Sequence, residues 1–263
     1  MRLLLLFGLL LAIQACTRTS QNGQKVDPTP VIETEQPSTA NFGTSIFKAV
    51  GNEPSWVLQI DEQQQMQLKT IDDHQLNLLT SVSEVTRMSD GDAIRLQTQR
   101  EGKFNVTLIA GSCTDNMKGN KFGQTVQVMV QTPEMDKPVL YKGCGNYEGA
   151  YQVNQKWILT KVDGKAVPKM EAAAMPHLNI QLFEGKMYGY SGCNNINGAV
   201  AMKGERLQFG PIAATKKACR DNTIENAMMQ TLNSKAQKFT IDKKTQELIM
   251  KSDQHTLTFR PER

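Results

Sequence analysis

Short runs of alternating apolar and polar residues cover most of residues 42–147 and indicate β-strands. Turn signals lie between many of these runs, notably Asp90-Gly91 and Glu101-Gly102. Many short strands at this spacing predict a closed barrel or a sandwich. The strands are expected at Ile46–Val50, Trp56–Ile60, Met66–Ile71, Leu76–Ser81, Val82–Met88, Ala93–Gln97, Phe104–Ala110, Thr125–Val130 and Val139–Lys142.

The alternation resumes at Trp157 after a short hinge, residues 148–156. Turns are expected at Asp163-Gly164, Glu184-Gly185 and Ser252-Asp253, because glycine and aspartate favour tight turns. The strands between them are expected at Trp157–Val162, Leu178–Leu182, Met187–Tyr190, Glu247–Lys251 and His255–Phe259.

One helix is expected after Cys219. Five residues follow the spacing of a single buried helical face, namely Ile224, Ala227, Met228, Thr231 and Leu232. Asn222, with Glu225 three residues later, approximates a capping box. The fold class predicted for the whole chain is therefore mainly β, with two small antiparallel β-barrel-like domains at 42–147 and 157–263, the second carrying one packed α-helix.

The first 15 residues have the pattern of a signal peptide. Arg2 supplies the positive charge, and the apolar run Leu3–Ile13 is too short to span a bilayer. Ile13-Gln14-Ala15-Cys16 is similar to a bacterial lipobox, although Gln14 replaces the usual small residue. An ordinary signal peptide with a chance cysteine is the alternative. If the lipobox is used, Cys16 is the acylated N-terminus and anchors the protein to a membrane.

Residues 16–41 are rich in proline, threonine, glutamine and serine and contain few large aliphatic residues. Such a composition cannot bury enough apolar surface to order itself, so we expect a disordered tether between the anchor and the first domain. The formal net charge of the whole chain is +4, which is too small to indicate nucleic-acid binding.

Four of the five cysteines remain if Cys16 is acylated. An even number of cysteines in an exported protein predicts disulfides. Four cysteines allow three pairings, and local pairing within each domain gives Cys113–Cys144 and Cys193–Cys219. A zinc site is the alternative, but the chain lacks CxxC spacing.

A Gly/Asn-rich segment, Ser191–Gly198, precedes Phe209-Gly210-Pro211 and Thr215 in the second half of the chain. Its residues Gly192, Asn194, Asn195 and Gly198 favour a tight turn, and binding of a ligand by the asparagine amides is the alternative. Together with Trp157, Cys193 and Cys219, this string resembles the META domain, the family of the bacterial heat-shock lipoprotein HslJ. The resemblance implies a small, mostly β, non-enzymatic domain linked to envelope stress.

The first half contains Gly51-Asn52-Glu53-Pro54 next to Trp56. Together with the segments around Cys113 and Cys144, this stretch resembles an uncharacterised envelope-lipoprotein domain, distantly similar to the MliC-type lysozyme inhibitors. The resemblance implies a binding loop, for which Asn52, Glu53 and Trp56 are the candidates. A surface turn without a binding role is the alternative for Glu53.

No catalytic pattern stands out. The three histidines, His74, His177 and His255, lie in different segments, and the chain has no nucleophile elbow, phosphate-binding loop or dinucleotide fingerprint. We therefore expect no metal, no cofactor and no enzymatic activity.

These observations support three functional hypotheses. The main one is an outer-membrane lipoprotein that faces the periplasm, takes part in envelope stress tolerance and contacts an envelope component. The second is an inhibitor of a lysozyme-like enzyme acting through the first domain. The third, and weakest, is an enzyme acting on cell-wall glycan.

Overall fold

The structure, a computed structural model, describes residues 42–88, 93–98, 103–168, 175–233 and 236–262. Contacts group Asn41–Arg263 into one compact unit. The predicted signal peptide, the tether, Cys16 and the predicted turns Asp90-Gly91 and Glu101-Gly102 lie outside the described residues.

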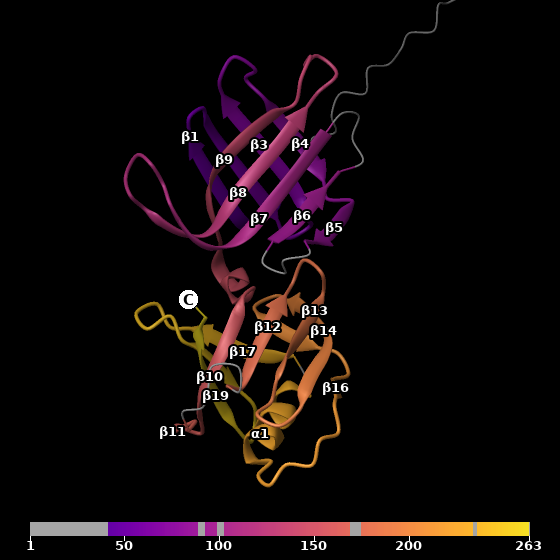
Figure 1. The fold of residues 1–263 in the computed structure, drawn as a ribbon, viewed down its shortest axis with the longest axis vertical. Helices are drawn as coiled ribbons and strands as arrows, with labels where there is room; N and C mark the ends of the chain where they lie inside the picture. The colour runs from indigo at the N-terminus through magenta and orange to yellow at the C-terminus, as the bar shows by residue number, and fades with distance from the viewer. Residues whose placement is uncertain (1–41, 89–92, 99–102, 169–174, 234–235, 263) are drawn as a thin grey trace, which may run out of the picture. The chain divides into compact units, whose positions relative to one another are not determined.

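The first half forms one antiparallel sheet of nine strands (Figure 1). Their order in the sheet is β4-β3-β2-β1-β9-β8-β7-β6-β5. The sheet curls into a half-barrel whose edges are β4 and β5. Its strands are β1 (Ser45–Asn52), β2 (Ser55–Asp61), β3 (Gln65–Ile71), β4 (Asn77–Ser81), β5 (Glu84–Arg87), β6 (Ala93–Gln97), β7 (Lys103–Thr114), β8 (Lys121–Gln131) and β9 (Val139–Tyr147).

All nine predicted strands are present in this sheet. Alternate residues face a common core, as in β3, where Met66 and Leu68 are buried between more exposed neighbours. The described strands β4 and β5 do not pair, so this barrel-like sheet stays open. In the two residues that link them, the amide of Val82 donates to the Gln64 carbonyl, just before β3, and that of Ser83 donates to the Gln97 carbonyl at the end of β6.

The second half forms a closed barrel of eight strands, because β10 pairs with both β12 and β19. The short strands β11 and β16 pair with β10 and β14 beside the barrel. The strands are β10 (Lys156–Val162), β11 (Lys165–Ala166), β12 (His177–Gln181), β13 (Lys186–Tyr190), β14 (Asn195–Lys203), β15 (Arg206–Phe209), β16 (Ala213–Ala214), β17 (Gln237–Ile241), β18 (Leu248–Lys251) and β19 (Thr256–Pro261).

The predicted helix is present as α1 (Thr223–Leu232), and Ala227, Met228, Thr231 and Leu232 are buried as the spacing indicates. The predicted capping box is wrong. Asn222 makes no side-chain capping bond, and the Glu225 carboxylate instead accepts hydrogen bonds from Ser191 and Asn194. The Glu225 carboxylate therefore bonds to residues distant in the sequence and does not cap the helix.

The predicted Gly/Asn-rich turn is shorter than expected. Gly192 has a φ of +94°, which suits a turn, but Asn195 and Gly198 lie within β14. Gly198 is a strand residue, and the segment around Pro211 lies close to it. A Cβ built at Gly198 would lie 3.0 Å from the Pro211 carbonyl oxygen. The glycine thus serves a close backbone approach rather than a turn.

Residues 148–156, expected as a hinge, include the 3-10 helix η1 (Gly149–Val153). Val153 is fully buried, and its carbonyl accepts a hydrogen bond from Trp157 Nε1 at 2.8 Å. Val153 and Trp157 both belong to the core of the closed barrel. The segment therefore contributes to the packing at the start of β10, and the domain boundaries stay predictions.

Candidate functional site

The polar groups of the Gly/Asn-rich motif bond to one another around Asn194. This side chain is 4% exposed and lies where the turn enters β14. Its amide nitrogen donates to both carboxylate oxygens of Glu225, each at 3.1 Å. Its amide oxygen accepts from Thr215 Oγ1 and from the Lys217 backbone amide, both at 2.8 Å. Asn194 therefore joins its own turn, the segment of Thr215 and Lys217, and α1.

The other motif residues extend this network. Ser191 is fully buried; its hydroxyl bonds to Glu225 and to the Asn194 carbonyl. Cys193 forms a disulfide with Cys219. Because Asn194 and Ser191 meet internal partners, their polar groups hold the turn against α1, which favours the structural interpretation over a ligand site.

Both predicted disulfides are confirmed. Cys113–Cys144 links β7 to β9 across a Cα–Cα distance of 5.6 Å, and Cys193–Cys219 spans 6.1 Å. Among the described residues, no group of three or more His, Cys, Asp or Glu side chains is placed to hold a metal ion.

The candidate binding loop splits into an exposed tip and a buried base. Glu53 is exposed in the turn between β1 and β2, whose pairing continues to Asn52 and Ser55. Trp56 is 2% exposed and donates from Nε1 to the Lys142 carbonyl at 3.3 Å. Trp56 therefore belongs to the core, and Asn52 and Glu53 are the part of the loop that can meet a partner.

A buried tyrosine lies edge-on to the Trp56 ring. Tyr141 is fully buried and donates to Asp72 Oδ2 at 2.6 Å. Burial is the larger cause that raises the pKa of Tyr141, and the hydrogen bond to Asp72 raises it further. Burial alone would raise the pKa of Asp72, but hydrogen bonds from Tyr141, Thr70 and two backbone amides outweigh it and lower that pKa. The pair is thus a neutral phenol bonded to a stable carboxylate.

The three histidines lie apart. His74 follows Asp72 in the turn after β3, and His177 begins β12. His255 bonds through Nδ1 to Asp163 at 2.8 Å and through Nε2 to Gln230 at 2.9 Å. None of these hydrogen bonds involves a residue of the motif or of the candidate loop.

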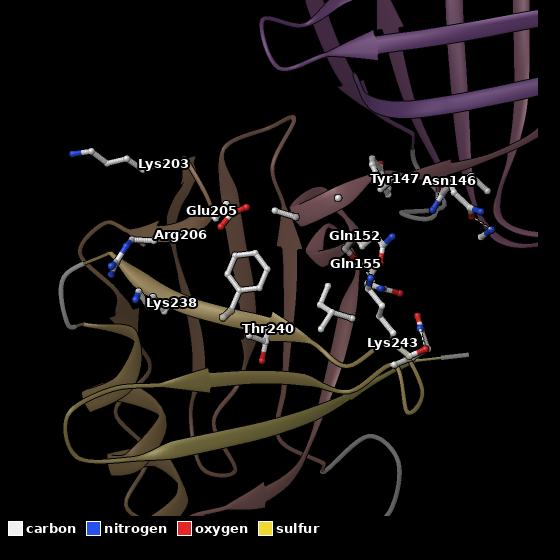
Figure 2. A pocket seen from close by; sticks show the side chains of 17 residues that line it. Asn146, Tyr147, Gln152, Gln155, Lys203, Glu205, Arg206, Lys238, Thr240 and Lys243 are labelled. Atoms are coloured by element: carbon white, nitrogen blue, oxygen red, sulfur yellow. Dashed lines mark hydrogen bonds between the residues drawn. The ribbon is translucent and has the colours of Figure 1, made fainter. Parts of the chain in front are cut away.

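The described residues line a pocket of about 1200 Å³ (Figure 2). Its charged residues are four cations, Lys203, Arg206, Lys238 and Lys243, and one anion, Glu205. The remaining lining combines side-chain amides with apolar groups and comprises Gly123, Gln124, Asn146, Tyr147, Gly149, Ala150, Gln152, Gln155, Phe239, Thr240, Ile241 and Gln246. The lining therefore carries an excess of positive charge.

The sequence did not single out this pocket. Its lining comes from β8, β9, η1, the β14–β15 turn, β17 and the turn after β17, which lie far apart along the chain. The one signal present in the sequence is the clustering of basic residues at 203–206 and 238–244. Such clustering alone is also typical of an ordinary solvated surface.

Comparisons with known proteins agree with the resemblance in the second half. Residues 150–263 match the family model of the META domain. This confirms the META prediction for that part of the chain. No curated protein matches the chain.

Two solved structures match the chain. One is described as the NMR structure of a protein, with 19% identity and a TM-score of 0.37, covering 43% of this chain and 95% of the other. The second is an NMR structure of a protein from Burkholderia xenovorans, with 23% identity and a TM-score of 0.35, covering 50% and 97%. Within the described ranges, no helix combines the length and the apolar character needed to cross a bilayer.

Proposed function

We propose that this chain is a non-enzymatic protein of the bacterial cell envelope, anchored to a membrane through acylated Cys16 and active in envelope stress tolerance. The observation that carries the proposal is the match of residues 150–263 to the META domain. The internal bonding of Asn194 and Ser191 to Glu225 agrees with it, because these motif groups serve the fold. The two disulfides suit an oxidising compartment outside the cytoplasm.

The location follows from the N-terminal sequence. The charged and apolar segments of residues 1–13 have the pattern of an export signal, and Ala15-Cys16 is the expected cleavage position. Thr17 differs from the aspartate that marks inner-membrane retention in enteric-type sorting. We therefore assign the protein to the outer membrane, facing the periplasm, with a further envelope component as its partner.

Substitution of the acylated cysteine tests this assignment. Cys16→Ser should abolish acylation and release the protein as soluble material or as an uncleaved precursor, measured by intact mass and membrane fractionation. Thr17→Asp is the matched variant, because it should keep the acyl chains and shift the protein to the inner membrane. An unchanged mass and an unchanged membrane fraction for Cys16→Ser would refute the anchor.

Inhibition of a lysozyme-like enzyme is the second candidate. It is favoured by the loop tip, where Glu53 is exposed and Asn52 half-buried, and which the buried Trp56 and the paired strands β1 and β2 hold in place. A rigid loop loses less conformational entropy on binding than a mobile one. The purified protein should then inhibit a lysozyme, and Asn52→Ala with Glu53→Ala should weaken inhibition by about 1–3 kcal/mol. Equal inhibition by the variant, or none by either protein across chicken-, goose- and invertebrate-type lysozymes, eliminates this candidate.

A further inference from the structure

Four basic residues lie directly opposite one another on successive strands of the closed barrel. Lys203 of β14 pairs with Arg206 of β15, Arg206 pairs with Lys238 of β17, and Lys238 pairs with Lys251 of β18. We call these four residues the cationic row. Since neighbouring strands are about 4.8 Å apart, the row places four positive charges within roughly 15 Å across the barrel surface.

All four side chains point outward. Each is exposed, whereas the adjacent residues Leu207, Gln237 and Met250 are buried. Figure 2 shows Arg206 and Lys238 next to each other, with Lys203 beyond them at the same side of the pocket. The row therefore continues from the pocket lining onto the open surface of β18.

The charges of the row are not neutralised by carboxylates of the described residues. The ion pairs there are Arg87–Glu184, Lys156–Glu262, Lys161–Glu247 and His255–Asp163, none of which includes a residue of the row. Among the described residues, the Arg206 side chain donates one hydrogen bond, to the Ala236 carbonyl at 3.3 Å. Glu205, in the turn between Lys203 and Arg206, is the one carboxylate of the pocket lining. Like charges directly opposite each other destabilise a sheet, so a bound polyanion would remove a repulsion that the free barrel carries.

We propose that the cationic row binds a ligand that carries at least two phosphate groups. A phosphate monoester carries about −1.5 to −2 charges at neutral pH, so two of them match the four cations of the row. Arg206 can bond a phosphate through two parallel N–H donors, and the three lysines act as point charges. The amides and the Tyr147 and Phe239 side chains of the adjoining pocket suit the body of such a ligand.

Two sources share this chemistry, namely the phosphorylated headgroup of a lipid and a free condensed phosphate. The choice between them rests on the proposed function, because the location of the protein decides which of them it meets. The row itself depends only on the barrel. A chain that is never acylated would overturn the anchor and leave the binding of phosphate intact.

Calorimetry on the full-length protein in a neutral detergent tests the row. The probes are inorganic tripolyphosphate, short-chain diacylglycerol pyrophosphate, which carries two phosphates, and, as the zwitterionic comparison, short-chain phosphatidylcholine. Wild type should bind at least one of the first two, with an affinity that falls as salt rises. Arg206→Glu with Lys238→Glu should raise the dissociation constant by roughly tenfold or more, because charge-assisted hydrogen bonds are lost.

The matched control is Lys48→Glu with Lys69→Glu. These lysines are exposed on β1 and β3 of the other sheet, and the substitution changes the net charge equally. The control should bind as wild type does. Arg206→Gln with Lys238→Gln keeps the row free of new charges and should also weaken binding while the melting temperature is retained.

The outcomes separate cleanly. Binding of diacylglycerol pyrophosphate alone identifies a lipid headgroup, and binding of tripolyphosphate alone identifies a free phosphate. Each result supports the proposal if the variants of the row weaken that binding. The proposal is overturned by absence of binding to both, by equal binding in wild type and both row variants, or by equal weakening in the Lys48 and Lys69 control.

Discussion

At the scale of single residues, Asn194 decides whether the META motif can hold its shape. Its amide is buried and faces the Glu225 carboxylate on one side and the donors of Thr215 and Lys217 on the other. An amide satisfies both sides because it has a donor and an acceptor end. A side chain with only acceptors cannot do so.

Asn194→Asp tests this assignment with almost no change of volume. At neutral pH the new carboxylate faces Glu225 and replaces a donor with an acceptor, so we expect the free energy of unfolding to fall by about 2–4 kcal/mol. Urea unfolding at pH 7 measures the loss. The neighbouring Asn195→Asp is the control, since Asn195 is exposed on β14, and it should change stability by less than about 0.5 kcal/mol. Equal losses would show that the amide has no special role.

Tyr141 and Asp72 give a second prediction at this scale. Because the hydrogen bonds lower the pKa of Asp72 in the folded state, their stabilisation is present above the ordinary carboxyl pKa of about 3.9 and is lost as the pH falls through the lowered folded value. Tyr141→Phe removes one of these bonds and should reduce the free energy of unfolding by about 1–2 kcal/mol at pH 7. The loss of stability on acidification below pH 4 should also become shallower, as measured by urea unfolding from pH 7 to 2. If the loss of stability below pH 4 is as steep in the variant as in wild type, the hydrogen bond from Tyr141 does not stabilise the Asp72 carboxylate.

At the scale of elements, two glycines let β1 and β9 close over Trp56. A Cβ at Gly51 would lie 2.7 Å from the Lys142 carbonyl oxygen, and one at Gly143 would lie 2.7 Å from Trp56 Cζ2 and 2.8 Å from the Val50 carbonyl carbon. Real side chains avoid such distances, so the pairing of these strands and the position of the indole depend on each other.

Gly143→Ala should therefore destabilise the half-barrel by about 3 kcal/mol, because backbone atoms would have to move. Gly123→Ala is the control on neighbouring β8, where the nearest atom to a new Cβ is Asn146 Oδ1 at 3.5 Å. The free energy of unfolding of that variant should lie within about 1 kcal/mol of the wild-type value. Trp56 fluorescence during urea unfolding, recorded in a Trp157→Phe background, measures the stability of both variants. Equal stability of the two variants would count against the close approach.

At the scale of the whole molecule, each disulfide closes a loop within one of the two sheet systems. Cys113–Cys144 ties β7 to β9, and Cys193–Cys219 ties the start of β14 to the segment before α1, with sequence separations of 31 and 26 residues. Loops of this length restrict the unfolded chain by amounts worth about 3–4 kcal/mol each in the chain-entropy model.

Cys193→Ser with Cys219→Ser should accordingly lower the free energy of unfolding of the closed barrel by a few kcal/mol. Tryptophan fluorescence of Trp157, recorded in a Trp56→Phe background, follows that barrel during urea unfolding. The same background with both cysteines intact is the reference. A double serine variant as stable as the reference would show that the link contributes nothing to the fold.

The sequence predicted the strands of the half-barrel well because they alternate apolar and polar residues. Met66 and Leu68 in β3 illustrate this, since alternate burial on one face is a local property of the chain. It set no bounds for β14, β15 and β17, and in β14 the glycine and asparagines indicate a turn. Their pairing partners, which no local pattern names, make them strands.

The candidate sites divide in the same way. The sequence predicted the two disulfides, because local pairing within each predicted domain gives one pairing. Its motif string also indicated the META domain. Only the tertiary structure shows that Glu225 bonds to Asn194 and that Trp56 belongs to the core. It alone also shows the cationic row, whose four residues lie opposite one another on neighbouring strands. Alternation fixes which face of a strand is buried, whereas register between distant strands decides which side chains meet.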